Sequence, residues 1–253
     1  MPYPAHVSDA AYCYDGSYAG FLCCIFESYT RREIPSAVLG PAEGQITLFG
    51  TEAIATDPTH ARRVANGLTR LGPMVRERVM TGFLSTEEEK DLILLRFARR
   101  CFDEGPRAVQ MLGDPDVHAA FVLERNVNNE VCRFIEFIRF EEKDGMLGSV
   151  IHPKNNVLPL LRGYFCSRLP DEDFLIFDAA HGTALLRQSG HVQYLAMEHY
   201  EPARDADELN WQALWKRFFH ALTIEERRNA KAQMNHAPKR FWGGMVEMRE
   251  PYI

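Results

Sequence analysis

The 253-residue sequence predicts an α+β fold in which a mostly helical portion is followed by a sheet and then by further helices. Three observations predict it. Apolar residues recur at helical spacing through residues 1–131, short apolar runs joined by tight turns fill 132–200, and helical spacing returns in 201–253. We expect one domain over 1–253, with the C-terminal helices packed on a central antiparallel sheet.

Helix caps and helix breakers divide the first portion. A short strand at 11–14 precedes Ser17, which is expected to cap the first helix, and a loop and a strand at 46–49 follow that helix. Asp57-Pro58 supplies the cap and first-position proline of a second helix, and Gly72-Pro73 ends it. Three further helices are expected: one after Pro73, one from a capping box at Ser85 or Thr86 to Gly105, and one from Asp114 to Val131.

The middle portion has the shorter spacing of strands. Residues 134–140 alternate imperfectly between apolar and polar, and Asp144-Gly145 forms a turn into a second strand at 146–152. A helix at 157–169 separates this hairpin from three more strands, at 174–178, 183–187 and 191–197. The predicted order is therefore strand-strand-helix-strand-strand-strand. From Glu208 the chain is helical again, with one apolar stripe: Trp211, Leu214, Trp215, Phe218 and Leu222.

Composition and motifs exclude several classes of protein. The net charge of −6 gives no global attraction to a polyanion, so nucleic acid would need a local basic patch. The six cysteines form no Cys-x-x-Cys pair, and no phosphate-binding glycine loop occurs, so we expect no metal and no nucleotide cofactor. The N-terminus lacks the basic head and apolar run of a signal peptide and no stretch has the length of a membrane span, which predicts a cytoplasmic protein without membrane contact.

The main local excess of positive charge lies between Lys216 and Arg240. Cations on one face of such a segment could neutralise the phosphates of DNA, and an aromatic ring at its end could stack on an unpaired base. On charge alone, a solvated helix face with Trp242 in the core is the commoner arrangement. The nucleic-acid-binding candidates are Arg227, Arg228, Lys231, Gln233, Lys239, Arg240 and Trp242.

Three smaller groups are candidates for a cleft or for catalysis. Glu130 could act as a base, or could fix a helix end with Arg133. Asp178 and His181 could form an acid–base pair, although turns often use the same residues. His152 and Asn155 stand where a helix begins, so they could bind an anion or simply cap that helix. The complete set of cleft candidates is Arg133, Arg139, His152, Asn155 and Arg168.

The sequence resembles a bacterial family of DNA-metabolism proteins built on the DUF4130 domain. The resemblance is carried by ordered blocks over most of the chain: Tyr14-Asp15-Gly16-Ser17, Glu130 with Arg133, His152-Pro153, Asn156–Leu161, Phe177-Asp178, Arg227-Arg228-Asn229 and Pro238–Trp242. It implies a partner, a radical-SAM protein that acts in DNA modification or repair. Related domains also occur joined to a uracil-DNA glycosylase-like domain, which this chain lacks.

Three functions follow from these expectations. The first is a DNA-binding accessory protein that acts with a radical-SAM DNA-repair enzyme. The second is an enzyme on nucleic acid, glycosylase-like or nuclease-like, that uses Glu130, Asp178 or His181. The third is a protein-interaction module that docks the radical-SAM partner through the aromatic helix 211–222 and makes no contact with DNA.

Overall fold

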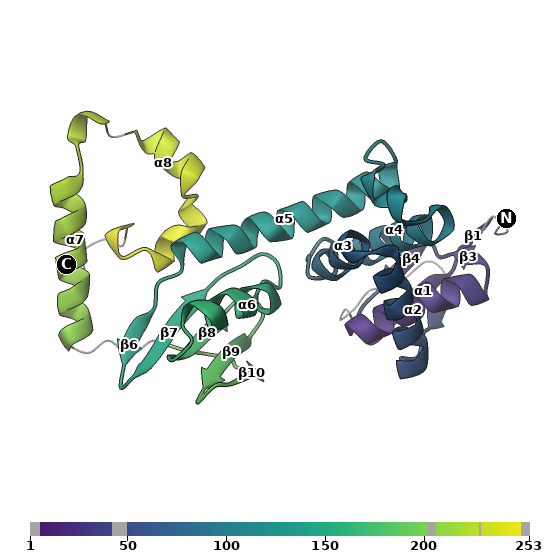
Figure 1. Cartoon of the computed structure of the whole chain (residues 1–253), viewed down its shortest axis with the longest axis horizontal. Coiled ribbons are helices and arrows are strands. Elements are labelled where there is room, and N and C mark those ends of the chain that lie inside the picture. Colours follow the sequence, from purple (N-terminus) through teal and green to yellow (C-terminus); the bar gives the residue numbers. More distant parts are fainter. Residues whose placement is uncertain (1–5, 42–49, 202–205, 228, 249–253) are drawn as a thin grey trace. The chain divides into compact units, whose positions relative to one another are not determined.

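The computed structural model describes residues 6–41, 50–201, 206–227 and 229–248. The chain divides into two compact units, residues 1–128 and 129–253 (Figure 1). Both contain helices and strands, so the predicted α+β class is confirmed. The prediction of one domain over the whole chain stays a prediction. None of the described helices is both long and apolar enough to cross a membrane.

The first unit combines two small parallel sheets with helices. β2 lies between β4 and β5 with all three strands parallel, and β1 pairs with β3. The elements are β1 (His6–Val7), β2 (Ala11–Cys13), α1 (Tyr18–Thr30), β3 (Glu33–Ile34), β4 (Ala37–Leu39), β5 (Thr51–Ala53), α2 (Pro58–Leu71), α3 (Pro73–Phe83), α4 (Lys90–Glu104), the 3₁₀ turn η1 (Pro106–Gln110) and the start of α5 (Pro115–Phe137).

Two of the predicted caps in the first unit are confirmed, and one is wrong. Ser17 Oγ accepts a hydrogen bond from Gly20 N at 2.9 Å and opens α1. Asp57 accepts from the backbone of Thr59 at 2.6 Å and opens α2. The predicted cap at Ser85 instead accepts from Glu87 N at 3.2 Å, which closes a turn before α4 begins at Lys90. The strand predicted at 46–49 lies outside the described residues.

The core of the first unit forms where α1 packs among the other elements. Phe21, Cys24 and Ile25 are fully buried, because α1 is apolar on nearly every side. Cys101 of α4 is equally buried, and burial raises the pKa of its thiol to about 12. These cysteines are free thiols, as expected for reduced core residues.

The second unit contains a five-stranded sheet in the order β10-β9-β8-β7-β6. Its elements after α5 are β6 (Glu141–Lys143), β7 (Met146–Ile151), α6 (Leu158–Arg168), β8 (Asp173–Asp178), β9 (Thr183–Gln188), β10 (His191–Ala196), α7 (Ala206–Leu222), η2 (Glu225–Arg227), α8 (Ala230–His236), η3 (Lys239–Gly244) and η4 (Val246–Met248). The turn between β6 and β7 is the predicted one, with positive φ at Asp144 (51°) and Gly145 (76°). Two adjacent residues with positive φ match the twist of an antiparallel hairpin.

The predicted layout of this sheet is wrong in two respects. β7 and β8 are parallel, with Ile151 opposite Asp178, because α6 carries the chain back to the same end before β8 begins. The expected strand at 134–140 is absent from this described stretch, because α5 continues to Phe137. Phe134, Phe137 and Ile138 have a three- and four-residue spacing, which places them on one face of a helix, whereas in a strand Phe134 and Phe137 would point to opposite sides.

Helices cover the sheet differently from the prediction as well. α6 lies against one face of the sheet, where Phe165 contacts Phe174 of β8 edge to face at 6.5 Å (Figure 1). On the other face, Leu175 and Phe177 pack with Tyr200, because alternate strand residues point to opposite sides. Among the described elements, α7 touches the edge strand β6 and η3 touches β7.

The apolar stripe of α7 is exposed, which corrects the expectation that the C-terminal helices pack on the sheet. Trp211 is 68% exposed, Phe218 54% and Leu222 64%. Trp215 donates from its indole N–H to Glu247 at 2.9 Å, which ties α7 to the 3₁₀ turn η4. The stripe predicted from the sequence is present, but the described sheet does not cover it.

Candidate nucleic-acid interface

A buried carboxylate, Glu130, organises one side of the second unit. Its side chain is 2% exposed and accepts three hydrogen bonds: from Lys154 N at 2.9 Å, from Asn155 N at 2.8 Å and from Asn155 Nδ2 at 2.7 Å. Arg240 Nη1 lies 3.4 Å from the same carboxylate. Because a buried charge requires partners, Glu130 connects three segments: α5 itself, the loop that precedes α6, and the 3₁₀ turn η3.

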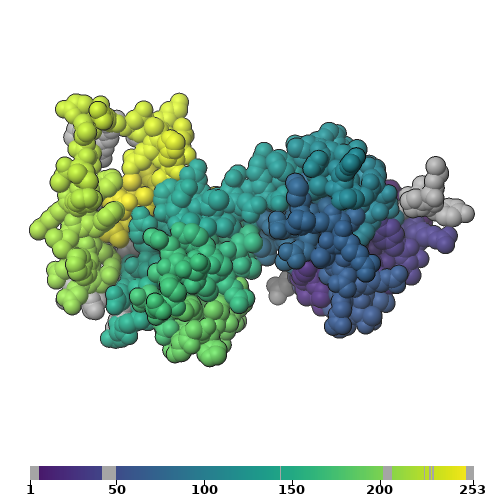
Figure 2. All heavy atoms as spheres, in the orientation of Figure 1, coloured from purple at the N-terminus to yellow at the C-terminus, as the bar shows by residue number. Residues whose placement is uncertain are grey.

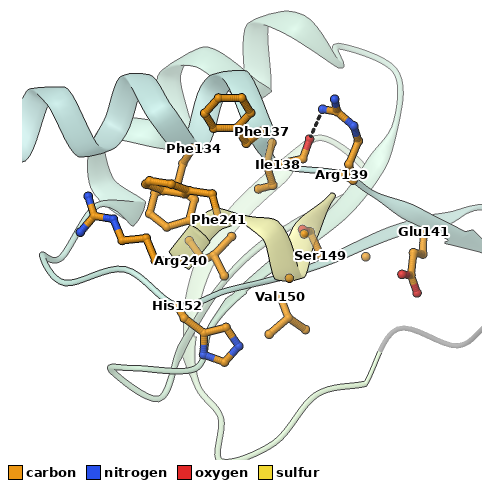
Figure 3. Close-up of a pocket in the computed structure, with 14 residues that line it drawn as sticks. Phe134, Phe137, Ile138, Arg139, Glu141, Ser149, Val150, His152, Arg240 and Phe241 are labelled. Atoms are coloured by element: carbon orange, nitrogen blue, oxygen red, sulfur yellow. Dashed lines mark hydrogen bonds between the residues drawn. The ribbon is translucent and has the colours of Figure 1, made fainter. Parts of the chain in front are cut away.

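Arg240, which pairs with Glu130, also lines a cleft of about 360 Å³. Its side chain is 52% exposed, and its guanidinium lies over the Phe241 ring at 4.7 Å. Figure 3 shows Arg240 and His152 toward one end of the cleft and Arg139 and Glu141 toward the other. The cleft thus receives residues from the end of α5, from β6 and β7, and from η3.

Aromatic rings form one wall of the cleft. Phe134 meets Phe241 edge to face at 5.0 Å, and Phe137 lies 5.8 Å from the same ring (Figure 3). Gly148 of β7 also lines the cleft, and a Cβ at this position would clash with the Tyr200 hydroxyl on the other side of the strand. Phe134 and Phe241 are buried, so Phe137, which is partly exposed, is the ring of this wall that could contact a base beside the exposed Arg240.

Of the three other arginine candidates for the cleft, only Arg139 lines it. Arg133 donates to the carbonyl of His236 at 2.8 Å and to Glu136 at 3.1 Å, which links α5 to the end of α8. Arg139 lines the cleft while donating to the carbonyl of Ile138 at 3.1 Å. Arg168 is the exposed last residue of α6 and does not line this cleft.

The C-terminal candidates do not form one uniform basic face. Arg227 in η2 and Lys231 in α8 are exposed, whereas Arg228 lies outside the described residues. Gln233 contacts the sulfur of Met248 at 3.6 Å. Lys239 is exposed, and its ammonium group lies near the ring of Trp242.

Trp242 is already engaged within η3. Its indole N–H donates to the carbonyl of Ala237 at 2.8 Å, and the Lys239 ammonium lies 5.8 Å from its ring centre. The side chain is partly buried, which agrees more closely with the structural alternative than with a free stacking ring. Phe241 and Arg240, rather than Trp242, face the cleft (Figure 3).

Asp178 and His181 form both the turn and the pair that the sequence left open. Asp178 Oδ1 accepts from the backbone N–H groups of Ala180 (3.0 Å) and His181 (3.1 Å), which is turn chemistry. Its other oxygen, Oδ2, lies 2.6 Å from His181 Nδ1. The carboxylate is 2% exposed and the imidazole 23%, so a buried acid orients a partly exposed base.

This pair faces a second, smaller hollow of about 160 Å³. The hollow lies where β8 ends and α6 begins, and its lining also includes Asn156, Thr183 and Tyr194. A hydrogen bond from Nδ1–H to Asp178 would leave the second ring nitrogen of His181 as a hydrogen-bond acceptor. The position at the carboxyl end of parallel strands is where α/β sheets commonly bind ligands.

Sequence reasoning missed the aromatic wall of the cleft and the residues beside the pair. The imperfect alternation of residues 134–140 predicts a strand that includes Phe134 and Phe137, although the three-residue spacing of these two rings is typical of one helix face. Asn156 and Tyr194 come from separate elements, so no local pattern links them to His181. No group of metal-ligating side chains occurs within the described ranges.

The comparisons with known proteins give one result. The model of a family described as a domain of unknown function, DUF4130, matches residues 88–247, which is more than half of the chain. The matched segment includes the cleft, the Glu130 network and the Asp178–His181 pair, whereas α2 precedes it. No curated protein and no solved structure matches the chain significantly.

Proposed function

We propose that this chain, which belongs to the DUF4130 family, is a DNA-binding accessory protein that acts with a radical-SAM DNA-repair enzyme. The observation that carries the proposal is the cleft of the second unit, which exposed Arg240 and His152 line together with the partly exposed ring of Phe137. Cations bind phosphate without regard to sequence, and rings bind any unpaired base.

Glu130 has a positioning role in this proposal. Its carboxylate is buried behind the cleft and fully occupied by the loop at Lys154 and Asn155 and by Arg240. Such a group holds the cationic side chain in place, while a water-accessible carboxylate at the same position would repel phosphate. The cleft also contains Glu141, which is 5% exposed and so presents little charge to solvent.

The cleft itself is tested with Arg139→Glu, because Arg139 lines it and a carboxylate there should repel phosphate and weaken the binding of labelled DNA. The exposed C-terminal cations, which do not line the cleft, are tested separately by the same measurement. We expect Arg227→Glu, Lys231→Glu and Lys239→Glu together to weaken binding by about 100-fold or more at ~0.1 M salt, because each lost phosphate contact contributes roughly tenfold there. Extending the set to Arg228→Glu tests the remaining candidate. Arg107→Glu, an exposed arginine of η1, is the control for charge reversal and should bind nearly as the parent does. Equal affinity of the triple variant and the parent would refute this assignment.

Accessory action also needs a surface for the partner enzyme. The stripe of α7 offers one, because Trp211, Leu214 and Phe218 are each more than half exposed. Large exposed apolar patches often mark protein interfaces. Co-purification with the radical-SAM partner should be lost in Trp211→Glu, and DNA binding by the chain alone should be retained. If Trp211→Glu abolishes co-purification with the partner and the parent chain does not bind DNA, the chain is a protein-interaction module, as in the third hypothesis.

The Asp178–His181 pair favours a second candidate function, an enzyme on nucleic acid. A histidine oriented by a buried carboxylate can take a proton from water or from a sugar hydroxyl. Incubating the purified chain alone with undamaged, uracil-containing and abasic DNA tests this alternative. Strand cleavage or base release that disappears in both His181→Ala and Asp178→Asn would establish the enzyme alternative. Absence of any product, in a time during which a reference glycosylase completes many turnovers, would exclude these reactions.

A further inference from the structure

Helix α2 of the first unit has an exposed face of unusual charge. Between Pro58 and Leu71 it contains three arginines and no acidic residue, in a chain whose acids outnumber its lysines and arginines by 35 to 29. Ala61, Val64 and Leu68 face the core, which leaves Arg62, Arg63 and Arg70 exposed on the other side. The charge of α2, which is drawn in blue on the visible surface of the first unit in Figure 2, is therefore presented to solvent.

These arginines line a shallow hollow of about 340 Å³ with Thr59 and Asn66. No acidic side chain lines it, and none within the described part of the chain forms an ion pair with Arg62, Arg63 or Arg70. Arg62, Asn66 and Arg70 follow one another at four-residue intervals, so the row extends over about 12 Å of helix. Such a row can contact more than one phosphate along a strand.

A second, more apolar hollow of about 540 Å³ adjoins the first. Its walls come from α1, α2 and α4 and include the rings of Phe26, Tyr29 and Phe102. Gly67 makes room for one wall, since a Cβ there would lie 2.7 Å from the Phe102 ring. Arg63 and Arg70 line both hollows, so the cations stand between a basic row and an aromatic groove.

The acidic side chains near the aromatic groove are already engaged. Glu27 pairs with Arg31 at 3.4 Å. Asp103 accepts a hydrogen bond from the Tyr29 hydroxyl at 3.2 Å. Phe26 is stacked on His60 with ring centres 3.8 Å apart and has the Arg63 guanidinium over it at 5.8 Å. The groove therefore has Arg63 and Arg70 on its α2 side, while Asp103 retains its charge beside the Tyr29 hydroxyl.

We infer that the first unit binds single-stranded nucleic acid along α2, with phosphates on Arg62, Arg63 and Arg70 and an unpaired base in the adjoining aromatic groove. The arginines of α2 favour a polyanion as the ligand. The aromatic groove favours a polyanion that carries one planar base for each phosphate, as a single strand of nucleic acid does. A duplex would use the basic row alone, because its bases are already stacked. The inference rests on the proposed function in taking nucleic acid as the ligand, and it is independent of the second-unit cleft.

The test compares single-stranded and duplex DNA of the same length by fluorescence anisotropy on the full chain. We expect the parent to prefer the single strand. Arg62→Glu, Arg63→Glu and Arg70→Glu together should lower single-strand affinity by about 100-fold at ~0.1 M salt and reduce the slope of log K against log salt by about 2, since each single-strand contact contributes about 0.7. The matched control reverses three exposed arginines of other elements, Arg76, Arg107 and Arg125, and should change affinity by less than about tenfold.

A second variant tests the groove without changing charge. Thr30→Trp places a large ring at the exposed rim of the groove, so it should abolish the preference for the single strand and leave the salt slope unchanged. Circular dichroism verifies that each variant is folded. If the glutamate variant unfolds, the corresponding alanine triple replaces it, because alanine favours a helix.

The outcomes separate this inference from the proposed function. If the parent binds DNA and the α2 triple variant binds equally well, while the Lys231 and Lys239 variants lose binding, the α2 site is wrong and the second-unit interface stands. If the α2 variant loses binding to duplex and single strand alike and Thr30→Trp has no effect, the groove is wrong. If the parent binds neither form of DNA, both the inference and the proposed function fail.

Discussion

Glu130 connects residues far apart in the sequence within the second unit. It accepts two backbone hydrogen bonds and one side-chain hydrogen bond from the loop at Lys154 and Asn155, and it pairs with Arg240 from η3. Because the carboxylate is 2% exposed, these contacts replace the water that a charge would otherwise bind. One residue therefore determines the position of both the loop and the cation beside the cleft.

Replacing this carboxylate should cost more stability than replacing an exposed one. We expect Glu130→Ala to lower the free energy of unfolding by about 3 kcal/mol, because buried donors lose their acceptor and a buried pair loses one member. The control is Glu136→Ala, since the Glu136 side chain is 52% exposed and pairs with Arg133 on the surface, where such pairs contribute less than about 1 kcal/mol. Urea unfolding measures both. Equal losses for the two variants would contradict the role of Glu130.

The contacts of Asp178 could be predicted from local sequence, whereas those of Glu130 could not. Asp178-Ala-Ala-His181-Gly182 permitted either a turn or an acid–base pair, and the two carboxylate oxygens of Asp178 serve one each. For Glu130, a helix end fixed by Arg133 was the expected alternative. The carboxylate instead bonds Lys154, Asn155 and Arg240, which are distant in sequence, while Arg133 bonds Glu136 and the carbonyl of His236. No spacing rule predicts such long-range partners.

At the scale of elements, α7 has an apolar stripe in which Trp211, Phe218 and Leu222 are each more than half exposed. Trp211→Glu and Phe218→Glu should therefore change the free energy of unfolding of the chain by less than about 0.5 kcal/mol each. Leu161→Ala in α6 is the contrasting variant, because Leu161 is fully buried and its truncation should cost about 3 kcal/mol. Urea midpoints provide the comparison. A loss at Trp211 as large as at Leu161 would show that the stripe is buried within the chain.

Elements with local signals were predicted well, and those that depend on distant partners were not. α1, α2 and α6 follow from apolar spacing, caps and breakers, all of which lie in the sequence. The parallel pairing of β7 with β8 depends on how α6 crosses over, and the end of α5 depends on Phe134 and Phe137 packing on Phe241, about a hundred residues away. The spacing of Phe134 and Phe137 permits the helix to continue, but it does not specify the distant ring on which they pack.

At the scale of the whole molecule, the buried ionisable groups of the first unit make stability depend on pH. Burial raises the pKa of Cys101 to about 12 and that of Tyr18 to about 12, and it also raises the pKa of Cys24. A raised pKa in the folded state contributes stability that is complete below the unfolded value and is lost as pH rises toward the folded value. The free energy of unfolding should therefore fall progressively above about pH 9, the ordinary value for cysteine.

Urea unfolding in the presence of a reductant tests this dependence. We expect a constant midpoint from about pH 7 to about pH 8 as far as these groups are concerned, and a falling midpoint from about pH 9 to about pH 11. Cys101→Ala should flatten part of the decline, since it removes one of the groups. A decline of the same steepness in this variant would contradict the assignment to Cys101.

The central claim is that the chain binds DNA through exposed cations of its second unit. The most direct measurement is the affinity of the full chain for labelled single-stranded and duplex DNA over a salt series from about 50 to about 200 mM. We predict micromolar or tighter binding at the low end, with log K falling linearly against log salt and with a shallower slope when Arg227, Lys231 and Lys239 are reversed. Absence of binding at low salt, or binding that does not respond to salt, would contradict the account.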